Sequence, residues 1–187
     1  MKKNIGAINI LYPIPIVIIG TEIDGKPNYI TIANIGNIDY STVSISLGKN
    51  QYSNQGIKKN RTLSINLPNE DLVVETDYAG MVSGSAVDKS KLFQSFYGEL
   101  KGAPMILEAP LTMECEVKNI IHMPNHNVFF VSPKNTYCNG DVITDEQVDL
   151  SKVRPILFDS FTKQYRKLGD SFAQCWHIGA SKKASYL

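Results

Sequence analysis

The sequence predicts a mainly β protein, a β-barrel of Greek-key type with a few helices. A series of short runs rich in β-branched and aromatic residues is separated by turn signals, and only a few stretches have helical character. Hydrophobic residues make up 43% of the 187 residues, which is enough for one core. No repeat, low-complexity tract or linker interrupts the chain, so we expect a single domain over residues 1–187.

The N-terminal part predicts a β-hairpin followed by another strand. The apolar run from Ile14 to Thr21 precedes the turn signal Asp24-Gly25, and the β pattern resumes from Tyr29 to Ala33. A small-residue connector, Ala33-Asn34-Ile35-Gly36, then leads to a second β-type run from Thr42 to Leu47. The connector would therefore join two strands.

The stretch from Thr31 to Asn54 has the features of a ligand-binding segment. Gly36 and Gly48 let a backbone approach a ligand closely. A helix would start with Ser53 or Asn54 as its N-cap, and its free backbone N–H groups would suit a phosphate. A capped surface helix that binds nothing would give the same pattern.

The predicted helix ends in the basic tract Lys58-Lys59-Asn60-Arg61. Cations favour a helix C-terminus, so solvated charges at the helix end explain this tract, and a nucleotide-binding patch is the alternative. The next segment, from Thr62 to Leu67, alternates apolar and polar residues and stops at Pro68. It predicts a half-buried strand.

The middle of the chain predicts two helices joined by a polar loop. Asn69 would cap the first helix, and the second would span Lys89 to Phe96. The loop from Met81 to Lys89 carries hydroxyls, a carboxylate and an ammonium, so it either connects the helices or completes a polar ligand site. The residues expected to face inward from the first helix are Leu72, Val73, Thr76 and Met81.

The last third returns to β-structure. Leu111 to Lys118 alternates apolar and charged residues, which predicts a strand with one wet face. Pro124-Asn125 predicts a turn, after which Asn127 to Val131 would pair back. Two further short strands are expected at Val153 to Phe158 and Phe172 to His177, separated by Tyr165 to Gly169.

Composition excludes several classes of partner. The 19 basic and 18 acidic side chains nearly cancel, so no net field favours nucleic acid or a membrane surface. The longest apolar run, Ile14 to Gly20, is too short to span a bilayer, and no signal peptide is visible, so we expect a cytoplasmic protein.

Cys115, Cys138 and Cys175 lack disulfide or zinc spacing, and we interpret them as buried thiols.

No evident cluster of acid, base or nucleophile appears in the sequence. His122 and His126 have the spacing of helical metal ligands, but Pro124-Asn125 between them predicts a turn, so we expect no metal site. His126 would be either a donor at the barrel rim or an ordinary turn histidine. A chain without catalytic motifs either does no chemistry or uses that of a cofactor.

A series of short motifs carries a family resemblance. In chain order they are Gly20-Thr21, Asp24-Gly25-Lys26-Pro27-Asn28, Thr31-Ile32-Ala33-Asn34, Ser44-Ile45-Ser46, Tyr52-Ser53-Asn54, Ser64-Ile65-Asn66, Ser83-Gly84, Asp88-Lys89 and Asn125-His126. With these motifs the chain resembles the flavoredoxin branch of the flavin reductase-like family over residues 10 to 170. The resemblance implies an FMN-binding split β-barrel, normally a homodimer with the flavin near the interface.

The resemblance also implies a set of FMN-binding residues. Those expected to hold the ring and ribityl chain are Thr31, Ala33, Asn34, Ile35, Ser46, Leu47 and Gly48. Those expected at the 5′-phosphate and in the loop that closes over the ligand are Tyr52, Ser53, Asn54, Ser83, Gly84 and Lys89. His126 falls where relatives carry a histidine near the ring and would be the catalytic donor. The phosphate segment lacks the arginine or threonine of some reductases, so it would depend more on backbone donors.

The expected function is that of an FMN-dependent oxidoreductase. Electrons would pass from NAD(P)H through FMN to a small-molecule or protein acceptor that the sequence does not identify. A non-enzymatic flavin carrier of the flavoredoxin type is the alternative, and a tetrapyrrole binder on the same barrel is a third hypothesis.

Overall fold

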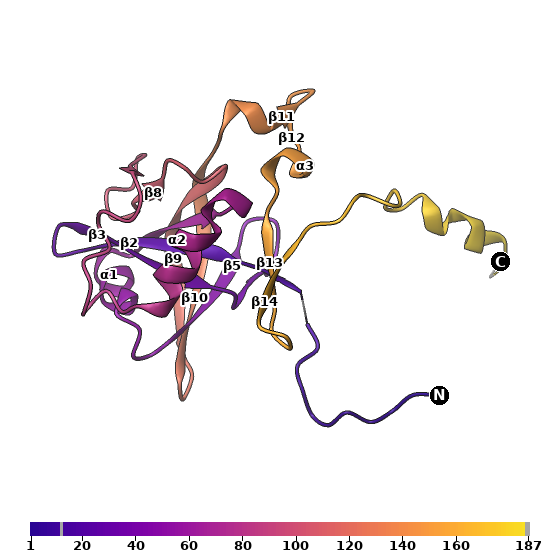
Figure 1. Ribbon diagram of the computed structural model, residues 1–187, viewed down its shortest axis with the longest axis horizontal. Coiled ribbons are helices and arrows are strands. Elements are labelled where there is room, and N and C mark those ends of the chain that lie inside the picture. The colour runs from indigo at the N-terminus through magenta and orange to yellow at the C-terminus, as the bar shows by residue number, and fades with distance from the viewer. Residues whose placement is uncertain (12, 186–187) are drawn as a thin grey trace.

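One antiparallel sheet of seven strands forms the body of the protein (Figure 1). The computed structural model describes residues 1–11 and 13–185, with the side chains at 181 and 183–185 left out. The strand order is β3-β2-β6-β9-β10-β5-β4. The strands are β2 (Val17–Ile23), β3 (Lys26–Ile32), β4 (Ile35–Asn37), β5 (Val43–Gly48), β6 (Thr62–Leu67), β9 (Leu111–His122) and β10 (His126–Cys138). The prediction of a mainly β fold is confirmed.

The two edge strands of this sheet are consecutive in the chain. Only Ala33 and Asn34 separate the end of β3 from the start of β4. The Ser46 N–H donates a hydrogen bond to the Asn34 carbonyl at 2.9 Å, which holds this connector against β5. Because two residues must bridge the opposite edges, the sheet curls into a barrel-like shape.

The main hydrophobic core lies inside the curled sheet. Val43, Ile45 and Leu47 alternate along β5 with half-buried neighbours, so one face of the strand supplies the core. Strand β10 adds Phe129 and Val131 to the same cluster. This inward alternation is why the sequence pattern found β5.

Two predictions in the first half of the chain need correction. Ile35-Gly36, predicted as part of the connector, lies in β4. The strand predicted as half-buried from Thr62 to Leu67 is present as β6 but is buried on both faces, because Ser64 and Asn66 are 0% exposed.

Two helices cover the sheet. Helix α1 (Ser53–Asn60) is followed by Arg61, whose N–H donates to the Ile57 carbonyl at 3.0 Å. The helix therefore ends within the basic tract, as predicted. A 3-10 turn, η1 (Glu70–Leu72), leads into α2 (Val73–Met81), which contacts β3. Asn69 stands at the predicted N-cap position, but it precedes the 3-10 turn and its side chain makes no cap bond, so the capping prediction is only partly correct.

The predicted inward face of α2 is only partly correct. Thr76 is buried and Leu72 packs against a second cluster centred on Tyr29, but Met81 is 75% exposed. Met81 is the last residue of the helix and lines a surface cleft beyond β3 instead.

The predicted helix from residue 89 to 96 is wrong. This segment forms turns and then β7 (Ser95–Phe96), which pairs with β8 (Met105–Ile106). Phe93 packs edge-on against Tyr29, with ring centroids 5.2 Å apart. The Gln94 N–H donates to the Glu108 carboxylate, whereas a helix would require the carbonyl of residue 90.

Strands β9 and β10 form a long hairpin around the predicted turn at Pro124-Asn125. The prediction of one wet face is wrong at Glu114, which is 0% exposed. The backbone N–H groups of Glu99 and Leu100, from a covering loop, and the side chains of Asn135 and Tyr137 donate to its carboxylate at 2.7–3.1 Å. Burial raises the pKa of Glu114, but these hydrogen bonds outweigh burial and lower it overall.

The cysteine prediction is partly correct. Cys115 is buried, and burial raises the pKa of its thiol to about 12. Cys138 and Cys175 are exposed, so their prediction as buried thiols is wrong. Both lie beyond the packed part of the barrel, in the last residue of β10 and in the C-terminal segment.

A smaller sheet, ordered β1-β13-β14, lies beside the body (Figure 1). It contains β1 (Ile14–Pro15), β13 (Ile156–Asp159) and β14 (Gln164–Lys167), so only part of the strand predicted from Val153 is present. The prediction of a strand from residue 172 to 177 is wrong, because that segment pairs with no other strand in the described chain. The remaining short elements are η2 (Gly140–Val142), β11 (Ile143–Thr144), β12 (Gln147–Val148), α3 (Leu150–Val153) and η3 (Ile178–Ser185).

Candidate functional site

A polar cleft lies where the start of α1, the end of α2 and residues 82–89 meet. We call residues 82–89 the cleft loop. Two adjoining cavities of about 250 and 330 Å³ share Tyr52, Gly84 and Lys89 as lining residues. The structure therefore brings together five of the residues predicted to bind the ligand, namely Tyr52, Ser53, Ser83, Gly84 and Lys89.

Gly84 allows the cleft loop to lie directly on the rest of the protein. A Cβ atom at this position would overlap the Asn28 amide oxygen and lie 2.8 Å from Cδ1 of Tyr52. Any other residue would push the loop away from β3 and from the start of α1. The close approach of the loop thus depends on glycine.

Lys89 is a buried cation at the junction of the two cavities. Its side chain is 4% exposed, and Nζ donates to the carbonyls of Tyr29 at 2.9 Å and Ala79 at 2.8 Å. Burial lowers the pKa of Lys89 from 10.5 to about 8. Because an ammonium has three donors, one remains for a ligand after these two bonds.

Ser53 adds a buried hydroxyl to the cleft. The residue is 1% exposed, and its Oγ accepts a hydrogen bond from the Asn28 amide at 2.8 Å. The Ser53 hydroxyl proton has no hydrogen-bond acceptor among the described residues. Four backbone N–H groups around the cleft also lack an acceptor there, those of Tyr52, Ser53, Ser83 and Gly84. An ammonium, a hydroxyl and several N–H groups form a donor set that suits an anion.

The prediction that Ser53 or Asn54 caps α1 is wrong. The residue before the helix is Tyr52, which makes no side-chain cap bond. The Asn54 amide group donates instead to the carbonyls of Gly48 and Gln51, each at 2.8 Å, and its oxygen accepts from Asn127 at 2.8 Å. Asn54 is therefore fully engaged within the protein, and its side chain fixes the end of β5 to the helix start.

These bonds continue in one direction to His122. Carbonyl oxygens only accept, so Asn54 must donate to them, and its own oxygen must accept from Asn127. The Asn127 oxygen is then left to accept from Nδ1 of His122, at 2.7 Å. This series of hydrogen bonds places the proton of neutral His122 on Nδ1. The sequence did not reveal this role of His122, because only the strand register places His122 opposite Asn127.

His126, the predicted catalytic residue, lies at the exposed start of β10. Its carbonyl accepts from the Met123 N–H in the hairpin turn, at 2.9 Å. It pairs with Gly48 across the sheet and does not line either cavity of the cleft. Its catalytic role stays a prediction.

The other predicted ligand residues lie along the chain leading to the cleft. The Thr31 hydroxyl donates to the Thr76 carbonyl, and the connector of Ala33 and Asn34 follows at the curled edge of the sheet. Ile35 lines a separate, mostly apolar cavity of about 400 Å³ at one end of the barrel. From β5, Leu47 points into the core, while Ser46 and Gly48 are half-buried.

Other kinds of site were also sought in the part of the chain that the structure describes. No group of three or more His, Cys, Asp or Glu side chains there is placed to hold a metal ion. None of its helices combines the length and apolar character needed to cross a bilayer.

Comparison with known proteins identifies the family. A family model described as "Flavin reductase like domain" matches residues 10–168. The chain is 32% identical to flavoredoxin from Methanosarcina acetivorans, with 97% of this chain and 98% of that chain covered and a TM-score of 0.93. It is 29% identical to flavoredoxin of Desulfovibrio vulgaris (Miyazaki F), with 96% and 100% covered and a TM-score of 0.87.

A more distant likeness concerns the fold alone. An FMN-binding protein from Thermus thermophilus is 16% identical, with 93% of this chain and 97% of that chain covered and a TM-score of 0.77.

The resemblance predicted from the sequence, including its flavoredoxin branch, is confirmed by the family model and the two flavoredoxins. The chain belongs to the flavin reductase-like family.

Proposed function

We propose that the protein is an FMN-dependent oxidoreductase that takes electrons from NAD(P)H and passes them to an acceptor. Family membership and the likeness to two flavoredoxins support flavin as the cofactor. The observation that carries the proposal is the donor set of the cleft, which contains a buried ammonium and a buried hydroxyl with unused protons.

The residues of the cleft fit the phosphate end of FMN. A phosphate presents only acceptor oxygens at neutral pH, and Lys89, Ser53 and the nearby backbone N–H groups present only donors to it. The segments predicted to hold the ring leave open space beside them. A Cβ added at Gly36 or Gly48 would meet nothing closer than 3.9 Å and 3.8 Å, respectively.

The chain's own residues would bind and orient the cofactor. When bound, FMN supplies hydride acceptance and one- or two-electron transfer, which no side chain provides. The cleft would fix the phosphate end, and the connector at Ala33 and Asn34 would lie along the ring and ribityl chain. We retain His126 as the proposed donor near the ring, and a homodimer as the proposed assembly.

A comparison of FMN with riboflavin tests the phosphate site. Riboflavin lacks the phosphate, so we expect FMN to bind more tightly, and Ser53→Ala to reduce the FMN-to-riboflavin affinity ratio about tenfold. The measurement is flavin fluorescence titration, with circular dichroism to check folding. Ser132→Ala is the control, because the Ser132 hydroxyl donates to Ser41 outside the cleft. Absence of flavin binding would overturn the proposal. An FMN-to-riboflavin affinity ratio that Ser53→Ala leaves unchanged would mean that the phosphate does not bind in this cleft.

Anaerobic reduction separates the enzyme from the carrier. The FMN-loaded protein should lose its yellow absorbance when NADH or NADPH is added, because a nicotinamide site allows hydride transfer. Retention of FMN without bleaching by either nucleotide would favour the alternative, a flavin carrier that receives electrons from another protein. His126→Ala should slow reduction more than it weakens FMN binding, and equal losses would assign His126 a structural role.

A further inference from the structure

The hairpin of β9 and β10 is joined to one end of the cleft by side-chain hydrogen bonds. Nδ1 of His122 donates to the Asn127 oxygen at 2.7 Å, and the Asn127 amide donates to the Asn54 oxygen at 2.8 Å. We call these three residues the His122–Asn127–Asn54 network. Asn54 is the second residue of α1, directly after Ser53. The network therefore ends beside the donor groups of the cleft.

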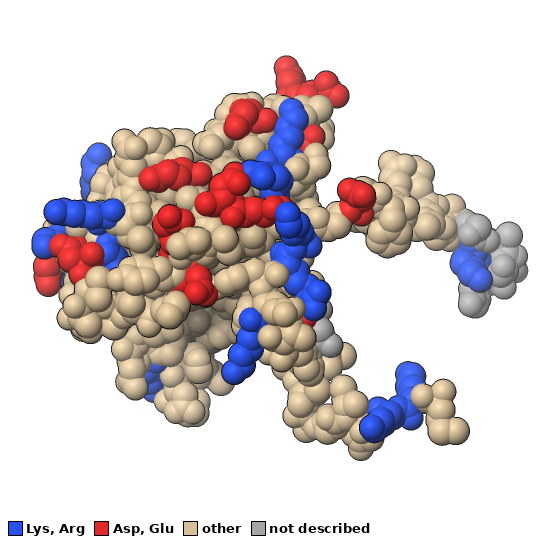
Figure 2. Space-filling view, viewed as in Figure 1, with Lys and Arg blue, Asp and Glu red and all other residues tan. Residues whose placement is uncertain are grey.

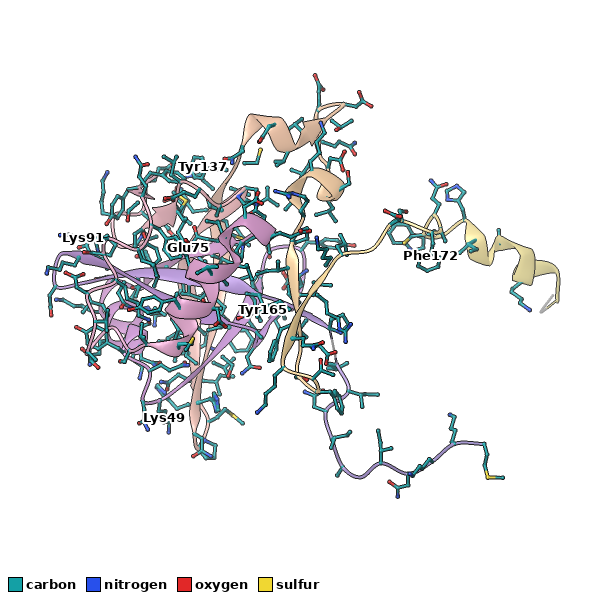
Figure 3. All side chains as sticks on the ribbon, viewed as in Figure 1. Lys49, Glu75, Lys91, Tyr137, Tyr165 and Phe172 are labelled. Carbon is teal, nitrogen blue, oxygen red and sulfur yellow. The ribbon has the colours of Figure 1, made fainter. Side chains whose placement is uncertain are left out.

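The backbone holds the hairpin tip at the same place. The Lys49 N–H donates to the Asn125 carbonyl in the hairpin turn at 3.0 Å, and Figure 3 shows Lys49 beside the tip of the hairpin. Lys49 lies in the turn between the end of β5 and the start of α1. The hairpin tip thus contacts the segment that leads into α1 through the backbone as well as through the network.

Asn54 fixes the direction of one backbone donor of the cleft. Its amide donates to the Gln51 carbonyl at 2.8 Å, and its backbone N–H donates to the same oxygen at 3.1 Å. The Gln51 carbonyl and the Tyr52 N–H belong to one peptide unit, which is planar and trans, so they point in opposite directions. Holding the carbonyl toward Asn54 therefore also holds the Tyr52 N–H, and Tyr52 lines both cavities of the cleft.

Each amide of the network has only one orientation that satisfies its partners. Asn54 must donate to the carbonyls of Gly48 and Gln51, so its oxygen faces Asn127. Asn127 must donate to that oxygen, so its own oxygen faces His122. Asn54 and Asn127 are 5% and 1% exposed, so solvent does not supply a replacement partner. An acceptor in place of Nδ1 of His122 would therefore oppose an oxygen.

We propose that His122 and Asn127 are positioning residues for the phosphate site, because they hold the start of α1 in the orientation that presents its donors to the anion. The inference rests on the proposed function, since it needs the FMN phosphate in the cleft. Neither residue lines a cavity of the cleft, so each acts through Asn54. Their effect should appear in the affinity for FMN and not in the affinity for riboflavin, which has no phosphate.

Variants of the exposed His122 test this role in the full chain. His122→Asn keeps a donor one bond beyond Cγ, where Nδ1 stands, and should keep the wild-type FMN-to-riboflavin affinity ratio. His122→Asp presents an oxygen to Asn127 and should lower this ratio about fivefold, as loss of one hydrogen bond does. Met123→Asp, at the same hairpin tip and 48% exposed, is the control for the added charge and should keep the ratio. Flavin fluorescence titration measures both affinities, and urea denaturation compares the stability of the variants.

The outcomes separate this inference from the proposed function. Wild-type protein that binds no flavin would overturn the proposed function and the inference with it. A preference for FMN that is equal in the wild type and in His122→Asp would refute the positioning role alone. Equal losses of FMN and riboflavin affinity, or the same fall in ratio for Met123→Asp, would also refute it, because neither result is specific to the phosphate and the network.

The tautomer of His122 tests the direction of the network without a ligand. A neutral imidazole carries its proton on one ring nitrogen, and the network requires Nδ1. Nitrogen-15 NMR of histidine-labelled protein, at a pH where the ring is neutral, should show Nδ1 protonated. The signals of His122 are those that disappear in His122→Asn. A proton on Nε2 would make Asn127 the donor to His122 and would overturn the proposal.

Discussion

The seven-stranded sheet and the three-stranded sheet are stabilised in different ways. The large sheet encloses a cluster of side chains such as Ile45, Leu63 and Phe129, each 0% exposed. Among the described residues, neither hydrophobic cluster includes a member of the small sheet. The small sheet faces η1 and α2 through polar pairs, including Lys167–Glu70 and Tyr165–Asp77, at 2.6 Å each.

The polar pairs that hold the small sheet lie at the protein surface. Figure 2 shows a column of basic side chains next to a group of acidic ones, and the Arg154–Asp71 and Lys167–Glu70 ion pairs join the small sheet and the segment before it to η1. The Lys167 side chain is 76% exposed. Exposed pairs contribute little and are screened by salt, whereas apolar burial is not. We therefore expect the small sheet to detach before the body unfolds.

The largest expected effect is on the core of the body. Phe129→Ala should reduce the free energy of unfolding by about 3–5 kcal/mol, because it removes a fully buried ring and leaves a cavity. Urea denaturation followed by circular dichroism measures this change. Phe172→Ala, at a 97% exposed position, is the matched control, tested below the concentration at which chains associate. A loss under 1 kcal/mol at Phe129 would mean that the core is not where stability resides.

The buried carboxylate of Glu114 should come next. Glu114→Gln should cost about 2 kcal/mol at neutral pH, because an amide nitrogen would face donors that now find a carboxylate oxygen. Since folding lowers the pKa of Glu114, its stabilisation is present above the unfolded pKa and is lost as pH falls through the folded value. Glu116→Gln on the exposed face is the control for unfolding in urea at several pH values. Equal losses for the two variants would contradict the buried network.

Lys89 should produce a pH dependence of the same sign as Glu114, but in an alkaline window. Between about 8 and 10.5 the unfolded chain holds a proton that folded Lys89 has released, so this group makes stability rise with pH across that window. Comparing urea midpoints of the wild type and Lys89→Met over this range isolates the contribution. Lys91→Met, in the same segment but exposed, should keep the wild-type slope. If both variants keep it, Lys89 is not buried as described.

The smallest effect is expected at the ion pairs of the small sheet. A double-mutant cycle on Arg154 and Asp71 should give a coupling of about 0.5 kcal/mol at low salt and close to zero in 1 M NaCl. Thermal unfolding of the four proteins at both salt concentrations measures it. A coupling of several kcal/mol that survives high salt would show that this pair is buried, and the contrast between the two sheets would fail.

Local sequence patterns predicted much of the large sheet. Strand β5 alternates because one face contacts the core, and this periodicity is visible without knowing the partner strand. The same sequence pattern misled in β6, because Ser64 and Asn66 are buried along with the apolar residues. The helix expected from residue 89 was wrong because Lys89 and Phe93 are held by distant groups on β3. Glu114 was expected to be exposed to solvent because the loop that covers it lies fourteen or more residues away in the sequence.

The candidate site was predicted in part. Tyr52, Ser53 and Lys89 meet at the cleft, as the family resemblance implied. The roles of Asn54 and Asn127 in a buried hydrogen-bond chain were missed, because amides in loops and strands give no sequence signal of their partners. Only the register of β5, β9 and β10 brings them together.

The register of β9 and β10 also limits how this sequence can change length. Lys134 has no partner on β9, since Pro133 pairs with Cys115 and Asn135 with Glu114. This extra residue sets which side of β10 meets Glu114, so deleting it would shift the following residues by one and turn Asn135 and Tyr137 away. Homologues that shorten or lengthen this strand by one residue should therefore have lost the buried acid as well.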